Sequence, residues 1–169
     1  MFKPLTVNLP YPPIDGINID KRSAIILCSA YAGSHGELNS ILQYIYHYFY
    51  FKKLGKHDCA NTIISIALAE MMHLETLGQL LLQLGADPVY ATNTPFSRDF
   101  YCTNKVIYSN QFEKMVMDDV TGELVAIDCY ERILRLLKNQ KVEAVIARIK
   151  LDEELHVKAL KQILSEKQG

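Results

Sequence analysis

The chain has 169 residues, a formal net charge of −1 and 22% charged residues. This length suits one domain with a sizeable core, and the near-neutral charge gives no indication of nucleic acid or an anionic membrane surface as a partner. No apolar run reaches the roughly 20 residues of a membrane span, and the N-terminus lacks a signal-peptide pattern. The expected location is therefore the cytoplasm. The four cysteines include no Cys-x-x-Cys pair, which argues against a zinc ribbon or rubredoxin module.

The sequence predicts an extended arm, residues 1–20, followed by an all-α domain over 21–169. Four prolines prevent a helix in the arm, and its apolar residues indicate packing on a surface. A first helix is expected over about 21–54, loosened at Gly33 and Gly36, with a left-handed residue after its end at Gly55.

The second half of this helix, residues 44–51 (YIYHYFYF), is aromatic or apolar nearly all round. A helix that is apolar on every side is normally buried on every side. We therefore expect this segment to contact the arm or a second subunit, which predicts a homo-oligomer. The alternative is a set of scattered, exposed aromatic side chains.

Three more helices are expected. Their ranges are between Asp58 and Gly85, about 111–138 and about 141–167. Residues 86–110 lack helical periodicity, and a connection of this length predicts a crossover between the second and third helices. Asn110-x-x-Glu113 resembles a capping box for the third helix. One long and two short connections predict a four-helix bundle with one crossover connection.

Two segments near the middle and the end of the chain share a Glu-x-x-His motif. Glu70 and His73 lie in IALAEMMHLETLGQLL, and Glu153 and His156 lie in IKLDEELHVKALKQIL. Residues three apart lie on one face of a helix, so each pair can bind one metal ion. The second motif follows the first by 83 residues.

A second pair of segments repeats with a similar offset of 86 residues. GELNSILQY carries Glu37 seven positions before Tyr44, and GELVAIDCY carries Glu123 seven positions before Tyr130. The chain is therefore a duplicated two-helix unit that supplies the ligands of a carboxylate-bridged dimetal site. The candidate metal ligands are Glu37, Glu70, His73, Glu123, Glu153 and His156. In the alternative interpretation the glutamates are solvated and the histidines are ordinary core residues.

Several neighbouring residues have two possible roles. Tyr44 and Tyr130 either donate hydrogen bonds to ligand carboxylates or only pack in the core, and His47 is a core or interface residue. Acidic residues expected to be surface charges rather than ligands are Glu75, Asp119, Asp152 and Glu154. A carboxylate-rich site with two histidines suits iron or manganese.

These motifs resemble the ferritin-like superfamily, which includes rubrerythrins, bacterioferritins and manganese catalases. The resemblance covers about residues 21–167, with all six ligand positions in the expected order. It implies two iron or two manganese ions and a reaction with hydrogen peroxide or dioxygen, as in a catalase-like or peroxidase-like oxidoreductase. Alternatives are ferritin-type iron oxidation and storage, or a structural or coat-type protein that retains a metal site.

Details of the resemblance favour the manganese catalases, which need no external electron donor. Ala126 stands where rubrerythrins have a further glutamate, and the Gly-Glu-Leu segment and the 33 residues from Glu123 to His156 are similar to the catalase pattern. In those catalases the glutamate at the position of Glu153 is a neighbour of the metals, which implies a catalytic role for Glu153 in proton transfer. Gly122 departs from the pattern, because manganese catalases carry a basic residue there.

Overall fold

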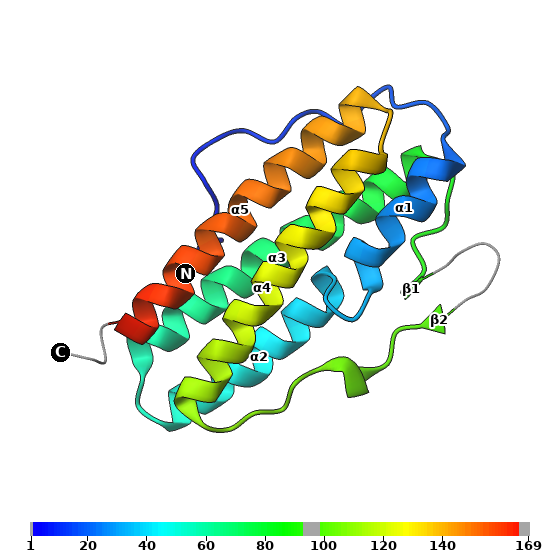
Figure 1. Cartoon of the computed structure of the whole chain (residues 1–169). Coiled ribbons are helices and arrows are strands. Elements are labelled where there is room, and N and C mark those ends of the chain that lie inside the picture. Colours follow the sequence, from blue (N-terminus) through cyan, green and yellow to red (C-terminus); the bar gives the residue numbers. More distant parts are fainter. Residues whose placement is uncertain (1, 93–98, 166–169) are drawn as a thin grey trace.

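A computed structural model describes residues 2–92 and 99–165, and these form an all-α bundle. Its helices are α1 (Lys21–Ala32), α2 (Glu37–Lys53), α3 (His57–Gln83), α4 (Phe112–Leu136) and α5 (Gln140–Ser165). α2 packs along α3 and α4 packs along α5, while α2 also contacts α4 and α3 also contacts α5 (Figure 1). α1 contacts α3 and α4, the same two helices that α2 contacts. α1 and α2 therefore occupy one position of the predicted four-helix bundle.

The single helix predicted over residues 21–54 is wrong, because the chain leaves the helix after Ala32 and re-enters it at Glu37. Two glycines make this break possible. A Cβ atom on Gly33 would lie 2.3 Å from the Ser29 carbonyl oxygen, and one on Gly36 would lie 2.4 Å from the Ala30 carbonyl oxygen. The break places the Glu37 carboxylate in the first turn of α2, where the helix dipole favours a negative charge.

The predicted helix ends are confirmed more often than the predicted starts. Gly55 and Gly85 have φ angles of 71° and 80°, the left-handed conformation expected after a helix. Asp20 caps α1 as expected, since its side chain accepts hydrogen bonds from two backbone amides. Asp58 lies in the first turn of α3 instead of at its cap, which is Lys56.

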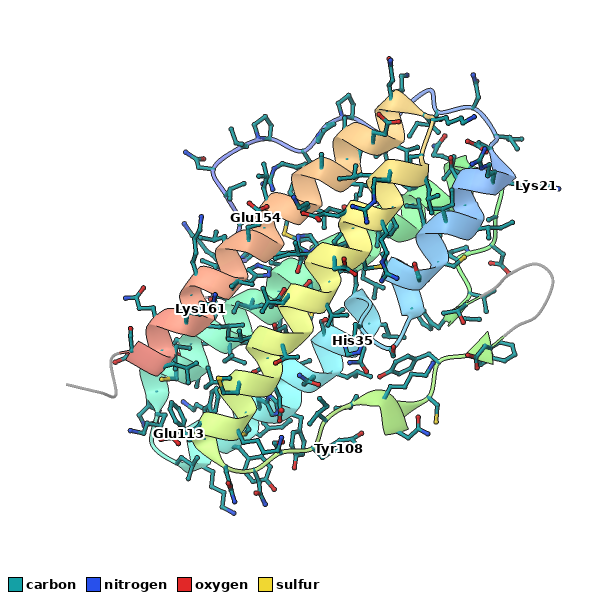
Figure 2. All side chains as sticks on the ribbon, in the orientation of Figure 1. Lys21, His35, Tyr108, Glu113, Glu154 and Lys161 are labelled. Atoms are coloured by element: carbon teal, nitrogen blue, oxygen red, sulfur yellow. The ribbon has the colours of Figure 1, made fainter. Side chains whose placement is uncertain are left out.

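The long crossover between α3 and α4 is confirmed. Its regular elements are β1 (Ala91–Thr92), the antiparallel β2 (Asp99–Phe100) and the 3-10 turn η1 (Thr103–Lys105). Tyr108, labelled in Figure 2, belongs to this crossover, and its ring meets the Tyr46 ring edge-on with centroids 5.0 Å apart. The capping box predicted at Asn110 is wrong, because Gln111 precedes α4 and makes no side-chain capping bond.

The apolar core forms two clusters along the length of the bundle. One joins α1 to the second half of α3, the second half of α4 and the first half of α5, with Leu80 and Ile146 fully buried in it. The other joins α2 to the first half of α3, the first half of α4 and the second half of α5, with Ile66 and Met115 fully buried. The predicted ligands occupy the intervening level of the bundle, so apolar side chains lie on both sides of them.

The N-terminal arm runs beside α5, as Figure 1 shows. The Leu5 amide donates to the Ser65 carbonyl of α3 at 2.9 Å, and Ile17 is buried in one of the core clusters. The prediction that the arm packs on a surface is therefore confirmed. Among residues 2–92 and 99–165, no helix combines the length and apolarity needed to cross a membrane.

Candidate metal centre

Four helices bring the predicted ligands together midway along the bundle. The six side chains, each at most 4% exposed, are Glu37 of α2, Glu70 and His73 of α3, Glu123 of α4, and Glu153 and His156 of α5. Their donor atoms form two sets with all atoms of a set within 4.8 Å: Glu37, Glu70, His73 and Glu153, and Glu70, Glu123, Glu153 and His156. Glu70 and Glu153 belong to both sets. Two adjacent sets of this kind are consistent with a dimetal site.

Both imidazoles turn the Nδ1 atom towards the shared carboxylates. Nδ1 of His73 lies 3.0 Å from Glu70 Oε2 and 3.0 Å from Glu153 Oε1. Nδ1 of His156 lies 3.1 Å from Glu70 Oε1 and 3.7 Å from Glu153 Oε2. The two rings lie side by side, with centroids 6.0 Å apart and an interplanar angle of 29°. Each shared glutamate therefore faces both histidines.

The partner of the other ring nitrogen, Nε2, shows which nitrogen of each imidazole carries a hydrogen. Nε2 of His156 lies 2.8 Å from the Leu5 carbonyl oxygen, which only accepts hydrogen bonds, so this nitrogen carries a hydrogen. Nε2 of His73 lies 3.2 Å from Asp152 Oδ2 and donates to that carboxylate. In the neutral form of either ring, the lone pair is then on Nδ1 and points at the carboxylate cluster. This is the orientation of a metal-binding histidine.

The donor set fits metal cations. Among the described residues, Glu70 Oε1, Glu153 Oε1 and His156 Nδ1 are buried without a hydrogen-bond partner. The 3.1 Å contact between His156 Nδ1 and Glu70 Oε1 is close but not aligned as a hydrogen bond. Buried charges require a partner of opposite sign, and four carboxylates with two imidazoles are suitable ligands for two divalent ions.

Without a cation, protonation has to relieve the repulsion between the buried carboxylates. Burial, together with the charges of Glu153 and Glu37, raises the pKa of Glu70 well above its usual range. Burial and the charge of Glu153 raise the pKa of Glu123 to about 7. In the metal-free protein the raised pKa of Glu70 favours its protonated form.

The pKa of Glu153 shifts in the opposite direction. Burial and Glu37 oppose its ionisation, but the adjacent Glu123, His156 and His73 side chains lower its pKa to about 2. Burial also opposes protonation of both imidazoles, yet the surrounding carboxylates hold the pKa of His73 and His156 well above the usual range. The pKa values of the two shared glutamates thus shift in opposite directions, down for Glu153 and up for Glu70.

The two tyrosines that end the repeated segments donate hydrogen bonds across the bundle. The Tyr44 hydroxyl of α2 bonds Glu123 of α4, and the Tyr130 hydroxyl of α4 bonds Glu37 of α2. Of the two roles open to these residues, hydrogen bonding to the candidate ligands is therefore confirmed. The bonds are crossed, since each tyrosine bonds the glutamate of the other repeat.

Residues 34–168 match the ferritin-like domain family. The chain belongs to that family. A comparison with curated proteins gives no match. Two solved structures of KatB, a manganese catalase from Anabaena, one of the wild type and one from Anabaena PCC7120, each align with a TM-score of 0.82. Each alignment covers 95% of this chain and 79% of the catalase chain at 18% sequence identity, so it establishes a shared ferritin-like fold.

In this ferritin-like bundle the prediction that Asp152 is a surface charge is wrong. Asp152 is fully buried and pairs with His73 and, at 2.8 Å, with Arg148 one turn earlier on α5. It also accepts hydrogen bonds from the Val7 amide and the Tyr11 hydroxyl of the arm. The Arg148–Asp152 spacing of four residues was the signal in the sequence, but it is equally common on exposed helix faces.

The prediction for Asp119 is also wrong. Asp119 is fully buried one turn before Glu123, with His47 Nδ1 at 2.8 Å and Gln43 Nε2 at 2.9 Å. His47 is buried as well, which confirms its assignment to the core. In contrast, Glu75 is exposed, as expected of a surface charge.

A pocket of about 30 Å³ adjoins the centre between α2, α4 and the crossover. Tyr44, Gly122 and Lys105 are among its lining residues. A Cβ atom added to Gly122 would meet nothing within 4 Å, so the place where the catalases carry a basic residue is open here. Lys105, which comes from the crossover, is a basic side chain in the same pocket. The pocket reaches Tyr44, whose hydroxyl bonds Glu123.

Proposed function

We propose that this ferritin-like protein is a peroxide-handling oxidoreductase that holds two iron or manganese ions. The proposed metal ligands are Glu37, Glu70, His73, Glu123, Glu153 and His156. The observation that carries the proposal is the sharing of Glu70 and Glu153 by both donor sets. A carboxylate has two oxygens, so each shared glutamate can bind both ions at once. Mixed carboxylate and imidazole ligands suit iron and manganese.

Catalase-like dismutation is the reaction that these features support best. It needs no electron donor, because one peroxide is oxidised to dioxygen while a second is reduced to two waters. A bound metal pair would supply the two-electron store that links these half-reactions. The chain has no Cys-x-x-Cys electron-transfer module, and Ala126 replaces the additional rubrerythrin glutamate. The fold is also similar to that of a manganese catalase.

The side chains of this protein have to hold protons between the half-reactions. Oxidation of one peroxide releases two protons, and reduction of the next consumes two. Glu153 lies within 3.7 Å of Nδ1 of both histidines, and we assign it proton transfer in addition to metal binding. Glu123 accepts a hydrogen bond from Tyr44, so it is the second group suited to this task.

An oxygen-electrode assay tests the proposal. Manganese-loaded and iron-loaded protein should each contain close to two ions per chain by elemental analysis, and the manganese form should release oxygen from peroxide without a reductant. Glu70→Gln should lower metal content and oxygen release. Glu75→Gln is the matched control, because Glu75 lies on the same helix but is exposed and contacts Gln79.

Other outcomes assign other functions. Peroxide consumption that requires a reductant and gives no oxygen would indicate a peroxidase. Unchanged metal content in both His73→Ala and Glu153→Ala would refute the ligand assignment.

Ferritin-type iron oxidation and storage is the second candidate, favoured by the match of residues 34–168 to the ferritin-like domain. Storage requires a hollow shell of many subunits. Fast iron(II) oxidation by a large assembly, without turnover of peroxide, would support it. A dimer or hexamer in solution would count against it.

A further inference from the structure

The N-terminal arm is held in place between α3 and α5 by specific hydrogen bonds. Arg148 Nε donates to the Leu9 carbonyl at 3.0 Å, and Arg148 Nη2 donates to the Val7 carbonyl at 2.9 Å. The Arg148 guanidinium also lies over the Tyr11 ring, 4.2 Å from its centroid. On the α3 side, the Leu5 amide bonds the Ser65 carbonyl. The arm is therefore attached to the two helices that carry the histidines.

The inner side of the arm reaches both imidazoles of the metal centre. The Leu5 carbonyl accepts the hydrogen of His156 Nε2 at 2.8 Å. The Val7 amide donates to Asp152 Oδ1 at 2.7 Å, and the Tyr11 hydroxyl donates to Asp152 Oδ2, the oxygen that also faces His73 Nε2. One histidine is bonded by the arm directly and the other through Asp152.

The internal repeat explains why the two histidines differ. Asp152 immediately precedes Glu153, and the equivalent residue before Glu70 is Ala69. α3 therefore offers His156 no carboxylate corresponding to the one that α5 offers His73. The Leu5 carbonyl takes the place of this missing partner. The arm therefore supplies the hydrogen-bond acceptor for His156 that the internal repeat does not provide.

We propose that arm residues 5–11 act as a clip that positions both histidines of the metal centre. The clip holds the Nε2–H of His156 directly and that of His73 through Asp152, so that Nδ1 of each ring points at Glu70 and Glu153. Leu5, Val7 and Tyr11 are positioning residues, since they touch the imidazoles or Asp152 and none of the proposed metal ligands' carboxylates. The inference rests on the proposed function only in taking His73 and His156 as metal ligands.

The expected effect on metal binding follows from the role of such partners. Loss of a hydrogen-bond partner of a metal-bound histidine typically weakens metal affinity about 10-fold to 100-fold, because the ring can rotate or change tautomer. Coupling of this kind is reciprocal, so metal binding should in turn tighten the arm on the bundle.

The first test measures metal retention in the full-length protein. Tyr11→Phe removes the hydroxyl bonded to Asp152, and Val7→Pro removes the backbone donor to the same carboxylate. Protein loaded with Mn²⁺ should lose its metal to excess chelator about 10 times faster when both changes are combined. Tyr31→Phe is the control, because it also removes one tyrosine hydrogen bond, to the Pro88 carbonyl, which involves neither Asp152 nor a histidine. Equal rates in parent, double variant and control would overturn the proposal.

The second test needs no metal. In metal-free protein with ¹⁵N-labelled histidine, Val7→Pro and Tyr11→Phe should shift the Nε2 resonance of His73. Leu5→Pro removes the Leu5–Ser65 bond and should shift that of His156. Tyr31→Phe should shift neither. Unmoved imidazole resonances in every arm variant would overturn the clip even if the protein binds metal. If the parent binds no metal, the proposed function fails, and the resonances alone decide whether the clip exists.

Discussion

Replacing the two shared glutamates by glutamine, one at a time, should separate their roles. In the metal-free protein, burial and neighbouring carboxylates raise the pKa of Glu70, which favours its neutral form. Glutamine has the size of a protonated glutamate, so Glu70→Gln should change the free energy of unfolding by less than about 1 kcal/mol. Metal affinity should nevertheless fall at least about 10-fold, since glutamine is a poor ligand for iron or manganese.

Glu153→Gln should behave differently without metal. The pKa of Glu153 is about 2 in the fold against an ordinary value of 4.5, so its ionised form contributes about 3 kcal/mol. A lowered pKa stabilises at every pH above the ordinary value, and this contribution is complete at pH 7. Its loss should lower the melting temperature by roughly 6–12 °C for a chain of this size.

Thermal unfolding in the presence of a chelator measures this contrast, and manganese titration measures affinity in the same two variants. The reasoning would be refuted if Glu70→Gln lowered the melting temperature as much as Glu153→Gln. It would also be refuted if either variant bound manganese as tightly as the parent.

Three more predictions follow from the structure. Because the pKa of Glu123 is raised to about 7, metal-free protein should lose about 3 kcal/mol of stability as pH rises from 4.5 to 7, and a flat melting profile over that range would contradict this. Exchange of Tyr46 and Tyr50 for lysine should shift the sedimentation mass towards monomer if α2 lies at a subunit interface, whereas a parent already monomeric in dilute solution would end that idea. His47→Ala should cost about 2 kcal/mol, because the buried Asp119 keeps its hydrogen bond from Gln43 but loses the one from His47. Two metal ions should still bind, and an unchanged melting temperature would refute the importance of the His47–Asp119 pair.

The cluster of candidate ligands was predictable from the sequence because helical geometry is local. Glu70 and His73 are three residues apart, and that spacing fixes a shared helix face before any packing is known. The repeat at Glu153 and His156 then implied a second face of the same kind. The long connection over residues 86–110 similarly implied the ferritin-like crossover, since short loops cannot make it.

Features that depend on packing between distant segments were not predictable. The Leu5 carbonyl that bonds His156 is a backbone group, so no residue type marks it in the sequence. Burial of Asp152 results from the arm lying over α5, and the helix pattern alone cannot show that. The break between α1 and α2 was predicted only as a loosening, because the clash that requires Gly33 involves the carbonyl oxygen of Ser29 in the finished helix. The cytoplasmic location stays a prediction.

The crossed tyrosine bonds have a consequence for the history and the engineering of this chain. The tyrosine of each repeat donates a hydrogen bond to the glutamate of the other repeat. Each repeat also contributes one carboxylate to the donor set of the other. Neither repeat can therefore assemble a finished centre by itself. A half-length ancestor would have needed to pair with an identical copy, and gene fusion would have preserved that pairing inside one polypeptide. By the same logic, two separately produced fragments divided within the crossover should each remain incomplete until they are mixed.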